Sequence, residues 1–128
     1  MKYLIDTNAW IGFFEGEPSF SPKVREVMTY ENWDCVISLA SIWEAAIKVG
    51  LEKLKLGYDL ETELPAILEE NGFTLLPIEY ADTVGVRNLP HTHGDPFDRI
   101  QAVQAESRNL TVLSRDSVFD AYGLKRIW

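Results

Sequence analysis

The chain has 128 residues, and its 46% apolar and 12% aromatic content is enough to bury one core, which excludes a mainly disordered protein. Its 12 basic and 20 acidic residues give a formal charge of -8, which argues against a long electropositive groove unless bound cations reverse the local field. Cys35 is the only cysteine, so no internal disulfide can form, and no apolar run reaches the ~18 residues of a membrane span. We expect one cytoplasmic domain over residues 1–128, with no membrane contact.

Short apolar runs alternate with helical stretches along the chain. Strands are predicted at residues 3–5, 35–37, 73–78, 110–113 and 124–128. Helices are predicted at residues 23–30 after Ser21-Pro22, at 39–49 after Ser38, at 60–71 around Pro65, and after Asp95-Pro96, with an irregular stretch at 50–59. Because no strand alternates polar with apolar residues, both faces of the sheet should be covered, which predicts an α/β fold with a mostly parallel sheet.

Four acidic residues fall where such a fold binds ligands. Asp6 follows the first predicted strand, and Asp116 follows the fourth, while Asp98 lies in the first turn of the helix opened by Pro96. Glu44 lies in an apolar stretch of the helix after the second strand. Since ligands of parallel sheets bind at the carboxyl ends of the strands, we expect these side chains to converge.

Each acid also has a purely structural interpretation. Asp6 and Asp116 could cap helices, Asp98 could complement a helix dipole, and Glu44 could pair with Lys48 one turn later. Taken together, carboxylates within ~4 Å repel by about 4 kcal/mol at a protein-surface dielectric, so four in one place call for cations between them. Oxygen ligands without cysteine favour Mg²⁺ or Mn²⁺ over zinc.

Four segments carry a family resemblance. YLIDTNAWI at residues 3–11, SIWEAAIK at 41–48, HGDPFDRIQAVQA at 93–105 and LSRD at 113–116 are similar to motifs of PIN-domain nucleases, and most of all to VapC-type toxins of type II toxin–antitoxin systems. The resemblance implies a single PIN domain at residues 1–128, built as a three-layer sandwich around a sheet of four to five strands. It further implies a homodimer and an antitoxin whose C-terminal segment lies in a groove beside the acids.

The same resemblance assigns roles to individual residues. The acidic quartet of the family falls on Asp6, Glu44, Asp98 and Asp116, which would hold one or two Mg²⁺ or Mn²⁺ ions for the hydrolysis of RNA phosphodiester bonds. Supporting polar residues that orient or steady these ligands are expected at Thr7, Asn8, Ser114 and Asp95. Of these, Asp95 is better explained as the helix cap before Pro96.

Basic and imidazole side chains near the acids are weaker candidates. Arg99 and Arg115 are adjacent to two of the acids and could contact RNA phosphate, although each could equally form a surface ion pair. His91 and His93 form an H-x-H pattern, which we discount as a metal pair because Mg²⁺ has little use for imidazole. We expect these histidines to contact substrate, partner or solvent.

Aromatic residues near the acids allow two interpretations. Trp10, Phe13, Phe14 and Trp43 could stack RNA bases, but their spacing favours core or interface positions. Trp10 and Phe13 are the candidates for an exposed groove that takes the antitoxin.

Two other functions suit the length and acidity of the chain. A phospho-acceptor receiver domain would carry adjacent acids after the first strand, where this sequence has only Asp6, and a lysine after a late strand, where it has Ser114-Arg115-Asp116. A PIN fold kept only as a binding module would be expected to lack part of the acidic quartet, and all four carboxylates are present.

Overall fold

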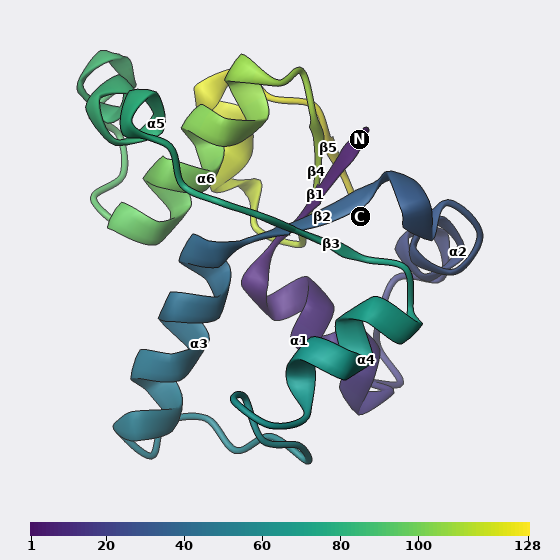
Figure 1. Cartoon of the computed structure of the whole chain (residues 1–128). Helices are drawn as coiled ribbons and strands as arrows, with labels where there is room; N and C mark the ends of the chain where they lie inside the picture. The colour runs from purple at the N-terminus through teal and green to yellow at the C-terminus, as the bar shows by residue number, and fades with distance from the viewer.

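A five-stranded, entirely parallel sheet forms the centre of the molecule (Figure 1). The computed structural model describes residues 1–128. The strands are β1 (Tyr3–Ile5), β2 (Cys35–Ser38), β3 (Thr74–Leu76), β4 (Thr111–Leu113) and β5 (Arg126–Ile127), in the spatial order β3-β2-β1-β4-β5. Strands β2, β1 and β4 are therefore central, and their carboxyl ends meet at one edge of the sheet.

Helices lie on both faces of this sheet. The α-helices are α1 (Thr7–Glu15), α2 (Pro22–Tyr30), α3 (Leu39–Gly50), α4 (Leu64–Glu70), α5 (Tyr80–Gly85) and α6 (Pro96–Ser107), and the 3-10 helices are η1 (Asn32–Asp34), η2 (Val86–Asn88) and η3 (Ser117–Tyr122). In Figure 1, α1, α2 and α4 lie on one side of the sheet and α5 and α6 on the other. The predicted three-layer α/β architecture is confirmed.

The sheet separates two hydrophobic clusters, because successive side chains of a strand point to opposite faces. Ile5 packs in the cluster that includes Trp10 of α1 and residues of α2 and α4. Leu4, its neighbour in β1, packs in the cluster that includes Ala102 of α6 and Phe119 of η3. Both residues are fully buried, which explains why the strands read as continuous apolar runs.

Local signals set the helix starts. The side chains of Ser21, Ser38 and Asp95 accept hydrogen bonds from backbone N–H groups in the first turns of α2, α3 and α6, as predicted. Helix α4 begins at Leu64 rather than at residue 60, because Pro65 fits only the first turn of a helix. Strands β3 and β5 are shorter than predicted, and α5 was not predicted at all.

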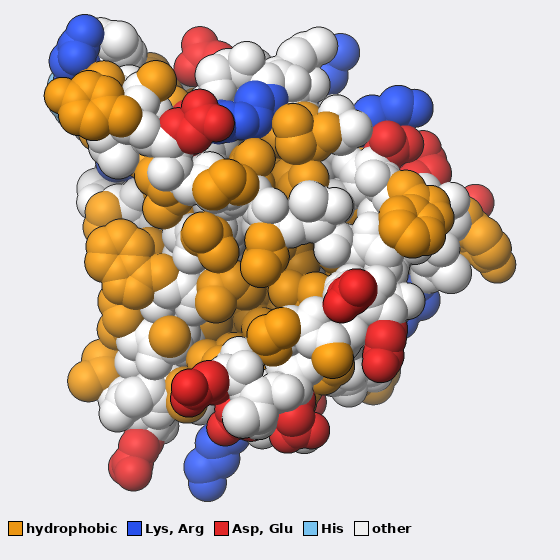
Figure 2. Space-filling model, viewed as in Figure 1, with side chains coloured by type: hydrophobic (Ala, Val, Ile, Leu, Met, Phe, Trp, Pro, Cys, Tyr) orange, Lys and Arg blue, Asp and Glu red, His pale blue; other side chains and the backbone are white.

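An apolar stripe runs along the exposed face of α3. Leu39, Trp43, Ile47 and Leu51 follow one another at four-residue spacing and are 40 to 60% exposed. Figure 2 shows hydrophobic side chains gathered over α3, the edge strand β3 and α5. No helix combines the length and the apolar character that crossing a membrane requires.

Candidate active site

The four predicted acids lie around the carboxyl-terminal edge of the sheet. Asp6 follows β1 directly, and Asp116 follows β4 after two residues. Glu44 lies in the second turn of α3, which follows β2, and Asp98 lies in the first turn of α6. The parallel sheet brings these chain segments together because the three central strands all end at this edge.

Ser114 links Asp6 to Asp116. The Ser114 hydroxyl donates to Asp6 Oδ2 at 2.7 Å, and the Asp116 backbone N–H donates to Ser114 Oγ at 2.9 Å. The other oxygen of Asp6 accepts the Thr7 backbone N–H at 2.7 Å, so Asp6 also caps α1. Asp116 Oδ1 accepts the Val118 N–H and caps η3. Asp6 and Asp116 therefore each cap a helix and also lie in the common cluster of acids.

A second chain of hydrogen bonds reaches Glu44. Thr7 Oγ1 donates to Glu44 Oε1 at 2.8 Å and lies 2.7 Å from Ser41 Oγ, which accepts Trp10 Nε1–H at 2.7 Å. Because the Thr7 hydroxyl donates its hydrogen bond to Glu44, the Ser41 hydroxyl must donate to Thr7 Oγ1. Each donor therefore points to the next residue in the order Trp10, Ser41, Thr7 and Glu44. Sequence reasoning missed Ser41, although its place one turn before Glu44 on α3 was a usable signal.

Glu44 is the only one of the four acids with a lysine or arginine partner. Lys48 Nζ lies 2.9 Å from Glu44 Oε2, which is the i, i+4 pair that the sequence allowed. Asp98 instead contacts an imidazole, since His93 Nε2 lies 3.0 Å from Asp98 Oδ2. His93 was expected to contact substrate, partner or solvent, and the structure places its ring in contact with Asp98, a candidate metal ligand. Its neighbour Asp95 caps α6, accepting the N–H groups of Phe97 and Asp98.

Burial and mutual repulsion perturb two of these carboxyls. Burial raises the pKa of Asp6 to about 6, and the charges of Glu44 and Asp116 add to the rise, while hydrogen bonds from Ser114 and Thr7 oppose it. Burial, Asp95 and Asp6 raise the pKa of Asp98 to about 7, against the hydrogen bond from His93. The raised pKa values mean that no nearby positive charge compensates the ionised form of these two carboxyls. Carboxylate oxygens in such surroundings are suited to bind a divalent cation.

The two arginines next to the acids have different surroundings. The Arg99 guanidinium donates to the backbone carbonyls of Pro90, His93 and Val86 at 2.8 to 3.0 Å. These bonds hold the segment before α6 in place, and contact of Arg99 with RNA phosphate stays a prediction. Arg115 is exposed, lies 5.1 Å from the Trp128 ring centroid and donates to Ser19 O.

A cavity of about 480 Å³ lies beside Asp6 and Asp116. Asn8 and Arg115 line it, together with Trp128 and the acidic side chains Glu15 and Glu17. The aromatics predicted for such a groove lie elsewhere. Trp10 is fully buried, because its ring packs in the core and its N–H is used by Ser41, and Phe13 packs against the rings of Phe14, Phe20 and Phe73. Trp43, by contrast, is 59% exposed and meets Phe97 edge-on.

The fold and the site define an α/β protein with a carboxylate cluster at the carboxyl ends of its parallel strands. A family model described as the PIN domain matches residues 3–125, so the chain belongs to the PIN domain family. Members of this family are generally nucleases that use divalent metal ions. Membership removes the receiver-domain alternative.

Several solved structures share the fold at low sequence identity. DNA-bound VapBC from Salmonella typhimurium matches with a TM-score of 0.70 at 19% identity, covering 99% of this chain and 97% of that chain. FitAcB from Neisseria gonorrhoeae matches with a TM-score of 0.66 at 22% identity, covering 98% and 96%. A toxin–antitoxin complex from Klebsiella pneumoniae matches with a TM-score of 0.61 at 18% identity, covering 99% and 97%. No curated protein matches the chain in sequence.

Proposed function

We propose that this chain is a metal-dependent endoribonuclease and the toxin of a VapBC-type toxin–antitoxin pair, acting in the cytoplasm as one PIN domain over residues 1–128. The observation that carries the proposal is the charge deficit of the acid cluster, in which Asp6 and Asp98 have raised pKa values and only Glu44 has a lysine partner. Four carboxylates in this state suit Mg²⁺ or Mn²⁺ as the cofactor.

In this proposal Asp6, Glu44, Asp98 and Asp116 bind the cation. When bound, such an ion lowers the pKa of a water molecule and stabilises negative charge on a phosphodiester. Ser114 and Thr7 orient the carboxylates of Asp6 and Glu44 through hydrogen bonds of 2.7 and 2.8 Å. No side chain acts as a covalent nucleophile.

Other residues of the site have supporting roles in the same scheme. Asp95 steadies the start of α6 and with it Asp98, through its bonds to two N–H groups of the first turn. Asn8 and Arg115 line the cavity beside Asp6, where they can reach a bound RNA strand. Arg115 is the only cation among the residues that line this cavity, so it is the residue we assign to phosphate.

The acidic cavity also suits a protein inhibitor. Its lining includes Asp6, Glu15, Glu17 and Asp116, so a basic segment of an antitoxin could fill it and block access to the acids. The neighbouring structures from VapBC, FitAcB and a toxin–antitoxin complex support a partner of this kind.

A second copy of the chain is the other partner that we propose. Two copies of the chain, each with a net charge of -8, repel one another, so an uncharged surface is the most favourable place for contact between them. The exposed apolar stripe of α3 and its C-cap is such a surface, formed by Leu39, Trp43, Ile47 and Leu51. This surface supports a homodimer formed through α3.

Cleavage of a structured RNA in the presence of Mn²⁺ tests the enzymatic proposal. We expect cleavage by the wild type, its loss in EDTA, and a fall of about 100-fold or more in Asp6→Asn and Asp98→Asn. Asp120→Asn, which alters an exposed acid paired with Arg126, serves as the matched control and should cleave normally. Cleavage that survives EDTA or both substitutions would contradict the proposal, and Mn²⁺ binding without cleavage of any RNA would favour a binding module.

A further inference from the structure

The loop before α6 brings an imidazole into the acid cluster. One ligand atom each from His93, Asp95 and Asp98 lie within 4.8 Å of one another, and His93 Nε2 is 3.0 Å from Asp98 Oδ2. In an octahedral site with bonds of about 2.1 Å, adjacent ligand atoms are about 3.0 Å apart and opposite ones about 4.2 Å. The distance between His93 and Asp98 is therefore that of adjacent ligands, and the 4.8 Å limit for the whole group is about 0.6 Å above the distance between opposite ligands, so a small shift of the side chains would let all three bind one ion.

Arg99 fixes His93 in this place. Its guanidinium donates to the His93 carbonyl at 3.0 Å and to Pro90 O at 2.8 Å, which ties the loop to α6 one residue after Asp98. The side chain of His93 is 34% exposed and that of Asp98 is 13% exposed, so the imidazole lies nearer to the solvent than the carboxylate that it contacts. The backbone of this loop is thus held in one position by a half-buried arginine.

Asp95 has one oxygen left for a ligand. Its Oδ1 accepts the N–H groups of Phe97 and Asp98, at 2.8 and 3.3 Å, and no hydrogen bond engages Oδ2. The capping role and a place in the cluster are thus compatible. The two carboxylates also offset the positive end of the α6 dipole, which by itself would disfavour a cation at this position.

Imidazole changes the cation that such a cluster prefers. Carboxylates alone suit Mg²⁺ and Mn²⁺, whereas an imidazole nitrogen favours transition metals, with affinity rising from Mn²⁺ to Co²⁺. We propose that His93 is a ligand of the cation held by Asp98, and that it makes this PIN domain select a transition-metal dication over Mg²⁺. The inference rests on the metal site of the proposed function and adds a ligand to it.

His91 provides a matched control within the same loop. It is exposed and lies outside the cluster formed by His93, Asp95 and Asp98. A second variant, His93→Gln, keeps an N–H donor toward Asp98 but removes the imidazole nitrogen. Comparing it with His93→Ala separates ligation from the mere positioning of Asp98.

The test is calorimetric titration of the full chain with Mg²⁺, Mn²⁺ and Co²⁺, combined with electron spin-echo spectroscopy of the Mn²⁺-loaded protein. We expect the wild type and His91→Ala to bind Co²⁺ most tightly and Mg²⁺ least, with a nitrogen coupling in the Mn²⁺ spectrum. Both His93→Ala and His93→Gln should lose the coupling and about 10-fold or more in Mn²⁺ affinity, with Mg²⁺ affinity little changed.

Other outcomes overturn the inference. A nitrogen coupling that survives in both His93 variants, or equal weakening of all three cations in His93→Ala with rescue by His93→Gln, would show that His93 only positions Asp98 or has no role. Failure of the wild type to bind any of the cations would instead remove the metal centre of the proposed function. Cation binding and RNA cleavage without any selective effect of His93 would leave that function standing and remove this inference alone.

Discussion

Two buried aspartates in this molecule have opposite electrostatic states. Asp6 is 6% exposed and Asp82 is 3% exposed. Burial raises the pKa of Asp6 to about 6, and neighbouring carboxylates add to the effect. Burial also acts to raise the pKa of Asp82, but two hydrogen bonds from Arg108, at 2.9 and 3.0 Å, and one from the Glu79 N–H outweigh it, so the pKa is lowered.

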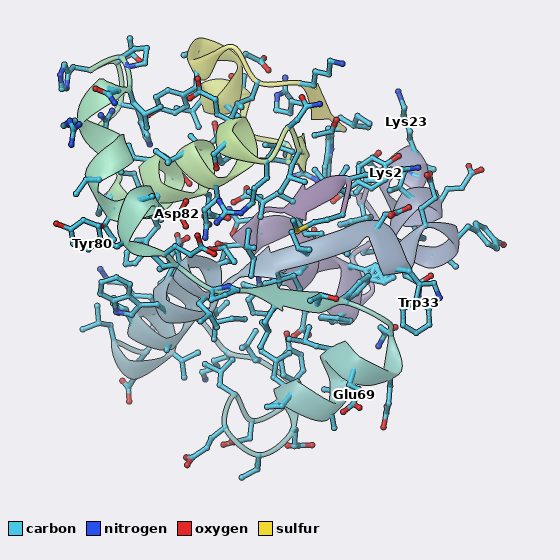
Figure 3. All side chains as sticks on the ribbon, turned by 45° about the horizontal axis from the view of Figure 1, so that its top comes forward. Lys2, Lys23, Trp33, Glu69, Tyr80 and Asp82 are labelled. Atoms are coloured by element: carbon cyan, nitrogen blue, oxygen red, sulfur yellow. The ribbon has the colours of Figure 1, made fainter.

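This difference in pKa distinguishes Asp82, which has a structural role, from Asp6, which is suited to bind a cation. Figure 3 shows Asp82 on the side of α5 that faces α6, while Tyr80 extends into solvent. The guanidinium of Arg108 thus completes Asp82 within the protein and fastens α5 to α6. Asp6 has no cation of its own, since only Ser114 and Thr7 bond to it. A buried carboxylate without an internal cation costs folding free energy that a bound metal ion can recover.

The largest effect on stability should follow from breaking the ion pair between Asp82 and Arg108. Asp82→Asn leaves the Arg108 charge with only a distant Glu79, 3.9 Å away, and we expect a loss of about 3 kcal/mol in the free energy of unfolding. Urea denaturation measures it. Asp120→Asn, in the exposed pair with Arg126, should cost less than about 1 kcal/mol. Equal costs for the two variants would show that burial does not decide the strength of such pairs here.

A divalent cation should complete the other aspartate. Mn²⁺ at about 100 times its dissociation constant should stabilise the wild type by about 2.7 kcal/mol, because it binds the folded state alone. Asp6→Asn and Asp98→Asn should show little of this gain in a thermal unfolding scan, while Asp82→Asn should retain it. An equal gain in all four proteins would place the cation away from these acids.

The metal-free protein should become less stable as the pH rises from about 4 to 7. The pKa of Asp6 is higher in the folded protein, about 6 against 3.8, so its contribution is complete below 3.8 and is lost as the pH rises through 6, up to about 3 kcal/mol. Asp82 has the opposite sign, and its contribution is present above 3.8 and is lost as the pH falls through its lowered pKa. Denaturation in EDTA across this range checks the slope, which Asp6→Asn should reduce.

The smallest effect should come from removing the Asp6 charge at neutral pH without metal. Asp6→Asn relieves repulsion from Glu44 and Asp116 but weakens the helix cap, so we expect a net gain of about 1 kcal/mol in EDTA. Asp82→Asn destabilises under the same conditions. A destabilised Asp6→Asn would mean that capping, rather than charge repulsion, dominates at this position.

Sequence patterns predicted the features that depend on local chemistry. The starts of α2, α3 and α6 followed from Ser21, Ser38 and Asp95, and the covered sheet followed from strands without polar alternation. The four acids were predicted to converge at one edge, and the structure places them there, while their role in binding a metal remains a proposal.

Long-range packing decided between the interpretations that the sequence left open at two positions. Trp10 was a candidate for an exposed groove, although its spacing favoured the core, and it is fully buried. A tryptophan in an amphipathic helix gives no signal of which neighbour covers it. Arg99 was a candidate for RNA phosphate or for a surface ion pair, and its guanidinium donates to three backbone carbonyls up to 13 residues away. The role of His93 was equally invisible, because its contact with Asp98 depends on how that loop folds back.

The sequence by itself determined the layered α/β fold, the helix caps and the family, because hydrophobic patterning, capping chemistry and short motifs act over a few residues. Tertiary structure alone decided which buried acids have a cationic partner within the protein. Asp82 and Arg108 are 26 residues apart, and Ser114 and Asp6 are 108 apart, so only the folded chain could show that the first acid has its cation and the second does not. Electrostatic energy depends on distance in space and on burial, and neither is encoded in spacing along the chain.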